Sequence, residues 1–186
     1  PAGQSRAASA AQRHRRVTAG VAAREMPLPK VECAMPSTVS ITRRLEFDAG
    51  HRLPNHQSQC RNIHGHRYAL EITLTSEVIR QEGAADDGMV MDFGDIKRIA
   101  NDKLVDLWDH AFLVYRGDRV MVEFLATIGG HKTVVLDVVP TAENLVKVAF
   151  QILEHAYLDR FGHELKLTQV RLYETPNCWA DAFGGS

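Results

Sequence analysis

Apolar and polar side chains alternate along residues 40–51 and again along residues 66–79, and this period of two predicts two β-strands. The apolar side of the first strand ends at His51. The apolar side of the second strand is continued towards the N-terminus by His66 and His64. Two such strands placed side by side bring three histidines together inside the fold. The shared face holds Leu45, Phe47, Ala49 and His51 in the first segment, and His64, His66, Tyr68, Leu70, Ile72 and Leu74 in the second.

Two helices are predicted by apolar positions that recur every three or four residues. The first follows Asp92, which can act as an N-cap, and is expected to end near Asp109. The second follows Pro140, with Thr141 as its N-cap and Glu143 near the positive end of the helix. The apolar positions are Ile96, Ile99, Ala100, Leu104 and Leu107 in the first helix, and Leu145, Val148, Ala149, Ile152, Leu153, Ala156 and Tyr157 in the second.

Two further strands are predicted at residues 134–139 and 165–174. The region 114–139 as a whole is interpreted as an extra hairpin. Polar residues at 54–59 and 82–88 predict loops. The order strand, strand, helix, strand, helix, strand is typical of an α+β fold in which the helices cover one face of a sheet.

The length of 186 residues fits one domain, and the formal net charge of -1 gives no indication of a nucleic-acid partner. Residues 1–36 differ from the rest, with six Lys or Arg against two Asp or Glu and no convincing hydrophobic period. We interpret them as a disordered N-terminal extension, and residues 37–186 as the single folded domain. A transit peptide, or an upstream start before an initiator near Met35, are the alternatives.

Three sparse cysteines, Cys33, Cys60 and Cys178, fit a reducing compartment better than a disulfide framework. We therefore expect a cytoplasmic protein. The sequence has no run of about 18 apolar residues, so no membrane span is expected.

The three histidines offer imidazole nitrogens suited to zinc, and a site with three protein ligands keeps one position open for water or substrate. His51 lies thirteen positions before His64, and Cys60 lies four positions before it. Cys60 is a candidate nucleophile or base beside the ligands. The alternative is that the histidines are separate buried residues or part of a turn.

Three other polar features are candidates for chemistry. His110, oriented by Asp109, could take a proton from a thiol, although such a pair at a helix end is commonly a surface cap. Glu174 ends a strand on its apolar side and could accept two hydrogen bonds from a planar donor pair, or could simply lie at the rim. Glu143 could be merely a first-turn residue. Trp179 and Phe183 could stack on a flat ligand or pack the C-terminus.

Six segments occur in a characteristic order: Phe47-Asp48-Ala49-Gly50-His51-Arg52-Leu53, Cys60 to His66, Gly88-Met89-Val90-Met91-Asp92-Phe93, Asp109-His110, Pro140-Thr141-Ala142-Glu143-Asn144 and Tyr173-Glu174-Thr175. No single segment is specific, but their ordered combination is. Together they resemble the 6-pyruvoyl-tetrahydropterin synthase and 6-carboxytetrahydropterin synthase family over about residues 40–180.

The resemblance implies a tunnelling fold, or T-fold: an antiparallel four-stranded sheet with two helices on one face, assembled as a trimeric barrel and often stacked as a hexamer. By the same resemblance, zinc is held by His51, His64 and His66, Cys60 is the proton acceptor, and His110 with Asp109 assists it. Glu174 anchors the pterin, with Glu143 and Thr141 also expected at the substrate. The family shares its sites between subunits, so these residues need not meet within one chain.

The spacing Cys-x3-His-Gly-His is similar to that of the bacterial carboxy enzymes of queuosine biosynthesis, whereas animal pyruvoyl enzymes resemble Cys-x5-His-Gly-His. The resemblance thus implies a zinc-dependent lyase that converts 7,8-dihydroneopterin triphosphate to 6-carboxytetrahydropterin, acetaldehyde and triphosphate. One alternative is a 6-pyruvoyl synthase that only eliminates triphosphate. Another is a non-enzymatic zinc- or pterin-binding protein of the same fold. The segment near residues 116–138 is longer than in compact members.

Overall fold

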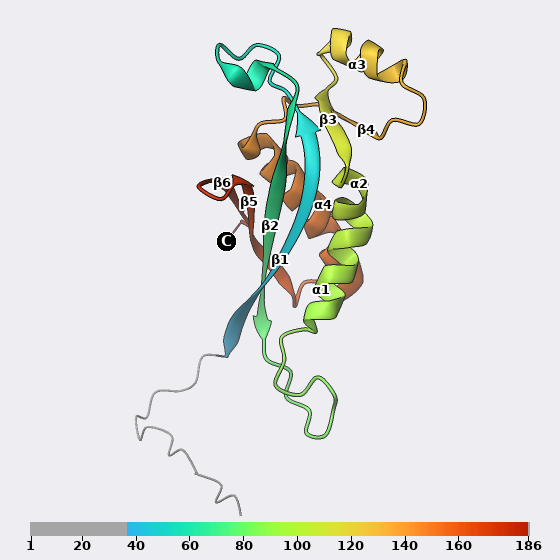
Figure 1. Cartoon of the computed structure of the whole chain (residues 1–186). Coiled ribbons are helices and arrows are strands. Elements are labelled where there is room, and N and C mark those ends of the chain that lie inside the picture. The colour runs from blue at the N-terminus through green and yellow to red at the C-terminus, as the bar shows by residue number, and fades with distance from the viewer. Residues whose placement is uncertain (1–36, 186) are drawn as a thin grey trace, which may run out of the picture. The chain divides into compact units, whose positions relative to one another are not determined.

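Six strands form one sheet in the computed structural model, which describes residues 37–185 (Figure 1). The expectation of a disordered extension at residues 1–36 lies outside this range. The strands are β1 (Thr38–His51), β2 (His64–Glu77), β3 (Ala111–Tyr115), β4 (Thr133–Leu136), β5 (Lys166–Thr175) and β6 (Cys178–Phe183). Their order across the sheet is β4-β3-β1-β2-β5-β6.

Strands β1 and β2 are the two predicted alternating segments, and they form a long antiparallel pair at the centre of the sheet (Figure 1). Strand β2 begins two residues earlier than its pattern suggested. His51, the last residue of β1, pairs with His64, the first residue of β2, and Ala49 pairs with His66. The pair therefore brings the histidines to one end of the sheet, on the buried face.

The first predicted helix consists of α1 (Phe93–Ala100), a π-helical turn (Asn101–Val105) and α2 (Asp106–Trp108). Asp92 caps it, because its side chain accepts a hydrogen bond from the backbone N–H of Gly94. A π turn adds a residue to the helical repeat and changes the face of every residue after it. The prediction that Leu107 is a core residue was therefore wrong: Leu107 is 54% exposed, and its neighbour Trp108 is buried instead.

The second predicted helix, α4 (Ala142–Phe161), is capped by Thr141, whose side-chain oxygen accepts a hydrogen bond from the backbone N–H of Asn144. Helices α1 and α4 pack on the same apolar face of the sheet and share one core with it. The side chains of this core that are least exposed include Tyr68, Leu70, Ile72, Leu74, Ile96, Leu104, Leu145, Leu153, Tyr157 and Leu172. The expected α+β architecture with helices on one face is confirmed.

The predicted hairpin at residues 114–139 is wrong. Strands β3 and β4 are parallel, and they are joined by the helix α3 (Arg119–Ala126). The N-cap Asp118 starts this helix, and Met121 and Leu125 pack against Phe112 and Val114 in a small second core. A parallel pair needs such a crossover, whereas a hairpin can join only antiparallel strands.

The sheet also has more strands than the four antiparallel ones expected. The pairs β1–β2, β2–β5 and β5–β6 are antiparallel, whereas β3 is parallel to β1 and β4 is parallel to β3. The sequence reading missed β6. Trp179 on this strand lies against Tyr173 of β5, with ring centroids 5.5 Å apart.

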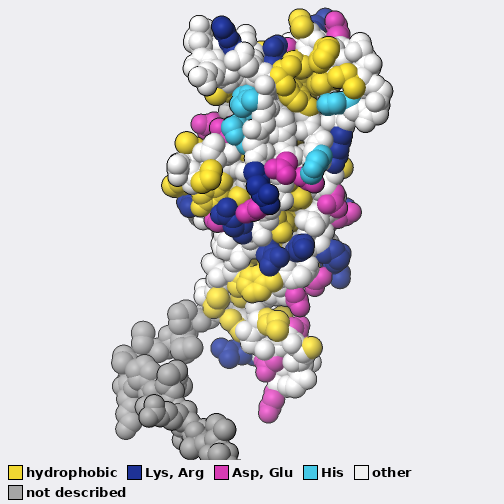
Figure 2. Space-filling view, viewed as in Figure 1, with side chains coloured by type: hydrophobic (Ala, Val, Ile, Leu, Met, Phe, Trp, Pro, Cys, Tyr) yellow, Lys and Arg dark blue, Asp and Glu magenta, His cyan; other side chains and the backbone are white. Residues whose placement is uncertain are grey.

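The second face of the sheet carries polar and charged side chains over β1, β2 and β5. Basic and acidic groups interleave there, as Figure 2 shows across the middle of the molecule. Examples are the ion pairs of Arg44 with Glu71, of Arg67 with Glu46, and of Arg171 with Asp181. None of the helices formed by residues 37–185 is long and apolar enough to span a membrane.

Candidate metal centre and its surroundings

His51, His64 and His66 form a cluster at the end of the β1–β2 pair. Their ring centroids are 4.5 Å apart for His51 and His64, 5.1 Å for His51 and His66, and 5.0 Å for His64 and His66. One ring nitrogen from each lies within 4.8 Å of the other two. The strand period that predicted a shared face is the reason these side chains meet.

Backbone carbonyls orient two of the three rings. His51 Nδ1 lies 2.8 Å from the carbonyl oxygen of Pro140, and His64 Nδ1 lies 2.8 Å from that of Asn62. A carbonyl only accepts hydrogen bonds, so Nδ1 carries the proton and Nε2 presents its lone pair. Carbonyl partners of this kind are typical of metal-binding histidines.

The donor set fits a metal ion on two further grounds. The Nε2 atoms of His51 and His66 are buried and have no hydrogen-bond partner, which costs free energy unless a ligand binds there. Burial lowers the pKa of His51 to about 4, and it also lowers the pKa of His66. Both rings are therefore neutral near pH 7, which is the form that binds metal.

Glu174, from β5, reaches the same cluster. Its Oε1 lies 3.5 Å from His51 Nε2, and its side chain is 25% exposed. Because His51 is neutral with its proton on Nδ1, it donates nothing to this carboxylate. The two groups are thus neighbours without a hydrogen bond, and both oxygens of Glu174 remain available to a ligand.

Asp109 and His110 belong to a second cluster with Asp48. His110 Nδ1 lies 2.9 Å from Asp109 Oδ2, and Asp109 Oδ1 accepts a hydrogen bond of 2.9 Å from the backbone N–H of Asp48. That N–H is the main cause that lowers the pKa of Asp109, with His110 adding to it. Of the described non-glycine residues, only His110 has a positive φ, 57°, and its side chain is 75% exposed.

Asp48 and the three histidines have their side chains on opposite faces of the β1–β2 pair. Asp48 alternates with Ala49 and His51 along β1, so its side chain points to the polar face. A shallow hollow of about 530 Å³ next to Asp48 is lined by His110, His131 and Phe112, and His66 of the histidine cluster also borders it.

The other predicted site residues are placed as follows. Cys60 is half-buried in a short 3₁₀ turn (Gln59–Arg61), where its carbonyl accepts a hydrogen bond from Leu53, and it belongs to neither cluster. Thr141 serves as the cap of α4. Glu143 is exposed in the first turn of that helix.

Several residues around the site were missed by sequence reasoning. The carbonyls of Pro140 and Asn62 leave no side-chain signal in the sequence. Tyr68 did leave a signal, because it continues the face of His64 and His66 with a polar group. Its hydroxyl is buried and has no hydrogen-bond partner.

The fold and the histidine cluster define an α+β protein with a three-histidine centre suited to a transition metal. Residues 40–184 match the model of the 6-pyruvoyl tetrahydropterin synthase family, and the chain belongs to this family. The expected family resemblance is therefore confirmed.

Two similar proteins are named 6-carboxy-5,6,7,8-tetrahydropterin synthase. The protein from Rickettsia bellii is 36% identical over 144 residues, which cover 77% of this chain and 99% of that protein. The protein from Haemophilus influenzae is 30% identical over 144 residues, which cover 76% of this chain and 96% of that protein.

Solved structures share the fold. An uncharacterized protein from Wolinella succinogenes has a TM-score of 0.65 at 20% identity, covering 80% of this chain and 99% of that chain. The 6-pyruvoyl tetrahydropterin synthase of Caenorhabditis elegans has a TM-score of 0.56 at 24% identity, covering 81% of this chain and 98% of that chain. The T-fold expected for the single chain is thus confirmed, apart from the strand count corrected above, and its assembly as a trimeric barrel stays a prediction.

Proposed function

We propose that this protein is a zinc-dependent 6-carboxy-5,6,7,8-tetrahydropterin synthase. It converts 7,8-dihydroneopterin triphosphate to 6-carboxytetrahydropterin, acetaldehyde and triphosphate, as a cytoplasmic step of queuosine biosynthesis. The observation that carries the proposal is the three-histidine centre with Glu174 beside it. The names of the similar proteins support the carboxy product.

His51, His64 and His66 would hold the zinc ion through Nε2, with one position left for substrate. When bound, zinc acidifies the hydroxyls of the substrate's side chain and stabilises negative charge that develops on oxygen. The buried, unpartnered Nε2 atoms of His51 and His66 support this ligand assignment.

Glu174 would bind and orient the pterin. An aminopyrimidinone edge presents adjacent N–H donors, and a carboxylate accepts two parallel hydrogen bonds from such a pair. Thr141 and Glu143, at the start of α4, are further candidates for contact with the substrate.

Cys60 would accept a proton from the substrate's side-chain carbons, for which it must be a thiolate. His110 would receive the thiol proton at Nε2, because its Nδ1 faces the carboxylate of Asp109 at 2.9 Å. Asp109 holds the ring in this orientation and stabilises the imidazolium that forms.

Asp109 and His110 form a cluster with Asp48 that includes none of the three histidines of the same chain. We therefore propose that a catalytic site combines the zinc ligands of one subunit with Asp109 and His110 of another, in a homotrimer or homohexamer. The exposed side chain of His110 supports this proposal, because it is free to meet a second chain.

A second candidate is a 6-pyruvoyl-tetrahydropterin synthase, which eliminates triphosphate without carbon–carbon cleavage. It is favoured by the description of the family and by the structural likeness to the Caenorhabditis elegans enzyme. The Cys-x3-His-Gly-His spacing favours the carboxy enzyme.

Product identification decides between these candidates. The zinc-loaded protein is incubated with 7,8-dihydroneopterin triphosphate, and the products are identified by mass spectrometry, with the Cys60→Ala variant as the control. Acetaldehyde together with the 6-carboxy product supports the proposal. The pyruvoyl product without acetaldehyde selects the second candidate. Turnover by neither protein would indicate a non-enzymatic zinc- or pterin-binding protein.

A further inference from the structure

Four side-chain nitrogen or oxygen atoms of residues 37–185 are buried without a hydrogen-bond partner: Arg43 Nε, His51 Nε2, His66 Nε2 and the hydroxyl of Tyr68. Three of the four lie at the histidine cluster. The two imidazole nitrogens are explained by a metal ion. The hydroxyl of Tyr68 is not a member of the metal-ligand set and needs another explanation.

The ring of Tyr68 is held in place on several sides. It stacks on Phe47, with ring centroids 5.3 Å apart and an interplanar angle of 15°. The rings of His51 and His66 lie edge-on to it, with centroids at 6.0 Å and 5.7 Å. Tyr68 is 0% exposed, so its hydroxyl cannot turn to solvent to find a partner.

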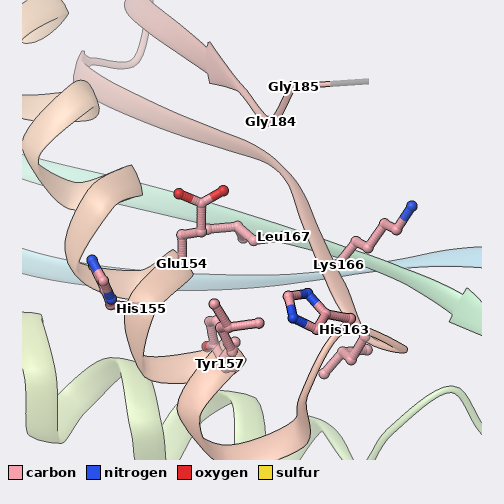
Figure 3. A pocket seen from close by; sticks show the side chains of 10 residues that line it. Glu154, His155, Tyr157, His163, Lys166, Leu167, Gly184 and Gly185 are labelled. Carbon is pink, nitrogen blue, oxygen red and sulfur yellow. The ribbon is translucent and has the colours of Figure 1, made fainter.

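A second buried tyrosine shows what a purely structural residue looks like in this fold. Tyr157 is 1% exposed, and its hydroxyl donates a hydrogen bond of 3.0 Å to the carbonyl oxygen of Ile96. Figure 3 shows Tyr157 on α4, among the residues that line a pocket between this helix and β5. The buried hydroxyl of Tyr157 is thus satisfied by the fold, and that of Tyr68 is not. An unsatisfied buried hydroxyl lowers stability, and phenylalanine would pack as well at that position.

The strand register places Glu174 across from Tyr68. Ala69 pairs with Tyr173 across β2 and β5, so Tyr68 and Glu174 are the next residues along each strand and lie on the same face. The ring centroids of Tyr68 and His51 are 6.0 Å apart, and Glu174 Oε1 lies 3.5 Å from His51 Nε2, so the tyrosine ring and the carboxylate border the same imidazole. The side chain of Glu174 is partly exposed.

We propose that the Tyr68 hydroxyl is the hydrogen-bond donor that positions the Glu174 carboxylate once a metal ion occupies the histidine cluster. Glu174 now lies 3.5 Å from His51 Nε2, the atom that a metal would use. A carboxylate left there would take the fourth coordination position and close it to substrate. A hydrogen bond from Tyr68 keeps that position open and leaves Glu174 aimed at the ligand. Tyr68 is thus a positioning residue that acts through Glu174.

The proposal rests on the proposed metal and pterin site, and its test has one arm that needs no pterin. Cobalt(II) replaces zinc, and the visible spectrum reports the ligands of the metal. Tyr68→Phe should shift the cobalt spectrum as Glu174 binds the metal, and adding Glu174→Gln to this variant should restore the spectrum of the unsubstituted protein. Tyr157→Phe should leave the spectrum unchanged. A spectrum unaffected by Tyr68→Phe overturns the proposal, whatever the substrate of the protein is.

The second arm measures the affinity of the zinc-loaded protein for pterin-6-carboxylic acid. Tyr68→Phe should raise the Kd by about tenfold to a hundredfold, which is the effect of losing one hydrogen bond to a charged group. In a Glu174→Gln background, Tyr68→Phe should not raise the Kd further, because the two substitutions remove the same interaction. Additive effects would show that Tyr68 acts independently of Glu174 and would overturn the proposal. If the unsubstituted protein does not bind the pterin, the proposed function fails, and the cobalt arm alone decides the role of Tyr68.

The stability of the Tyr68→Phe variant distinguishes a positioning role of Tyr68 from a structural role. Tyr68→Phe should leave the denaturation midpoint of the metal-free protein unchanged or raise it, because it removes an unsatisfied hydroxyl. Tyr157→Phe should lower the midpoint and leave the Kd for the pterin unchanged. A loss of stability in Tyr68→Phe as large as that in Tyr157→Phe would contradict the proposal.

Discussion

The guanidinium of Arg52 makes two hydrogen bonds to the carboxylate of Asp118, with Nε 2.6 Å from Oδ2 and Nη2 2.8 Å from Oδ1. Arg52 directly follows the zinc-ligand candidate His51, and Asp118 is the N-cap of α3. The pair therefore fixes α3 and the end of β1 to one another. Asp118 is 6% exposed, so water screens this pair less than a surface ion pair.

Asp118→Asn should lower the free energy of unfolding by about 2–3 kcal/mol, because it replaces two charge-assisted hydrogen bonds and leaves Arg52 without its counter-charge. Asparagine can still cap α3, so the loss reports the ion pair. Chemical denaturation measures it. The matched control is Asp137→Asn, which breaks the exposed pair with Arg116 and should cost only about 0–1 kcal/mol. Equal losses in the two variants would contradict the assignment.

The Arg52–Asp118 pair predicts how the stability of the folded protein depends on pH. Hydrogen bonds from Arg52 hold the pKa of Asp118 below its ordinary value of 3.8. Its contribution to stability is therefore complete above that value and is lost as the pH falls through the lower pKa of the folded protein. Between pH 5 and pH 2, stability should fall less steeply in Asp118→Asn than in the unsubstituted protein.

Metal analysis tests the histidine ligands. We expect one zinc ion per chain, and we expect His64→Ala to lose most of it, because two protein ligands hold zinc much less tightly than three. The control is His155→Ala, on the exposed surface of α4, which should retain full zinc. Full occupancy in His64→Ala would remove this residue from the site.

Cys60→Ala should keep zinc and fold but lose turnover, since it removes the proposed proton acceptor. Cys178→Ala is the control, because Cys178 is also free but lies exposed on β6. An active Cys60→Ala enzyme would mean that another group accepts the proton.

His110→Ala should lower kcat by about 10²–10⁴-fold, the range typical of general acid–base assistance, and should leave zinc in place. Mixing His110→Ala with Cys60→Ala subunits tests the shared site. In mixed oligomers, a site that combines Cys60 of a His110→Ala subunit with His110 of a Cys60→Ala subunit should be active. Absence of recovery in verified mixed oligomers would contradict a site shared between subunits.

Glu174→Gln should weaken the binding of a pterin product analogue by about tenfold or more, because an amide N–H then faces an N–H donor of the ligand. Zinc content should not change. Titration calorimetry with the zinc-loaded protein measures the effect. Affinity equal to that of the unsubstituted protein would remove Glu174 from the pterin site.

The central part of the site was predictable from the sequence because it depends on strand period alone. A strand fixes the face of every second residue, so the common face of His51, His64 and His66 followed from their positions. The carbonyl of Pro140 and the unpartnered hydroxyl of Tyr68 depend on tertiary packing, and no local pattern encodes them.

The elements that were missed have short or misleading patterns. Strand β6 has only six residues, three of them exposed and three partly exposed, so it shows no clean alternation. The turn residues Pro176 and Asn177, between β5 and β6, were the available signal for a hairpin. In α3, the N-cap Asp118 followed by Met121 and Leu125 indicated a helix, but the β-branched residues after it favoured a strand reading.

The hydrogen bond from His51 to the carbonyl of Pro140 indicates where the chain can gain or lose residues without disturbing the histidine cluster. Helix α3 and the edge strand β4 lie between β3 and Pro140, whose carbonyl oxygen is the partner of His51 Nδ1. Insertions or deletions there leave the histidine cluster intact as long as this carbonyl keeps its place. Gly129 and Gly130, whose Cα positions have open space around them, mark where a foreign domain could be inserted. Natural variation in length should therefore concentrate between Thr127 and His131, and should stop before Pro140.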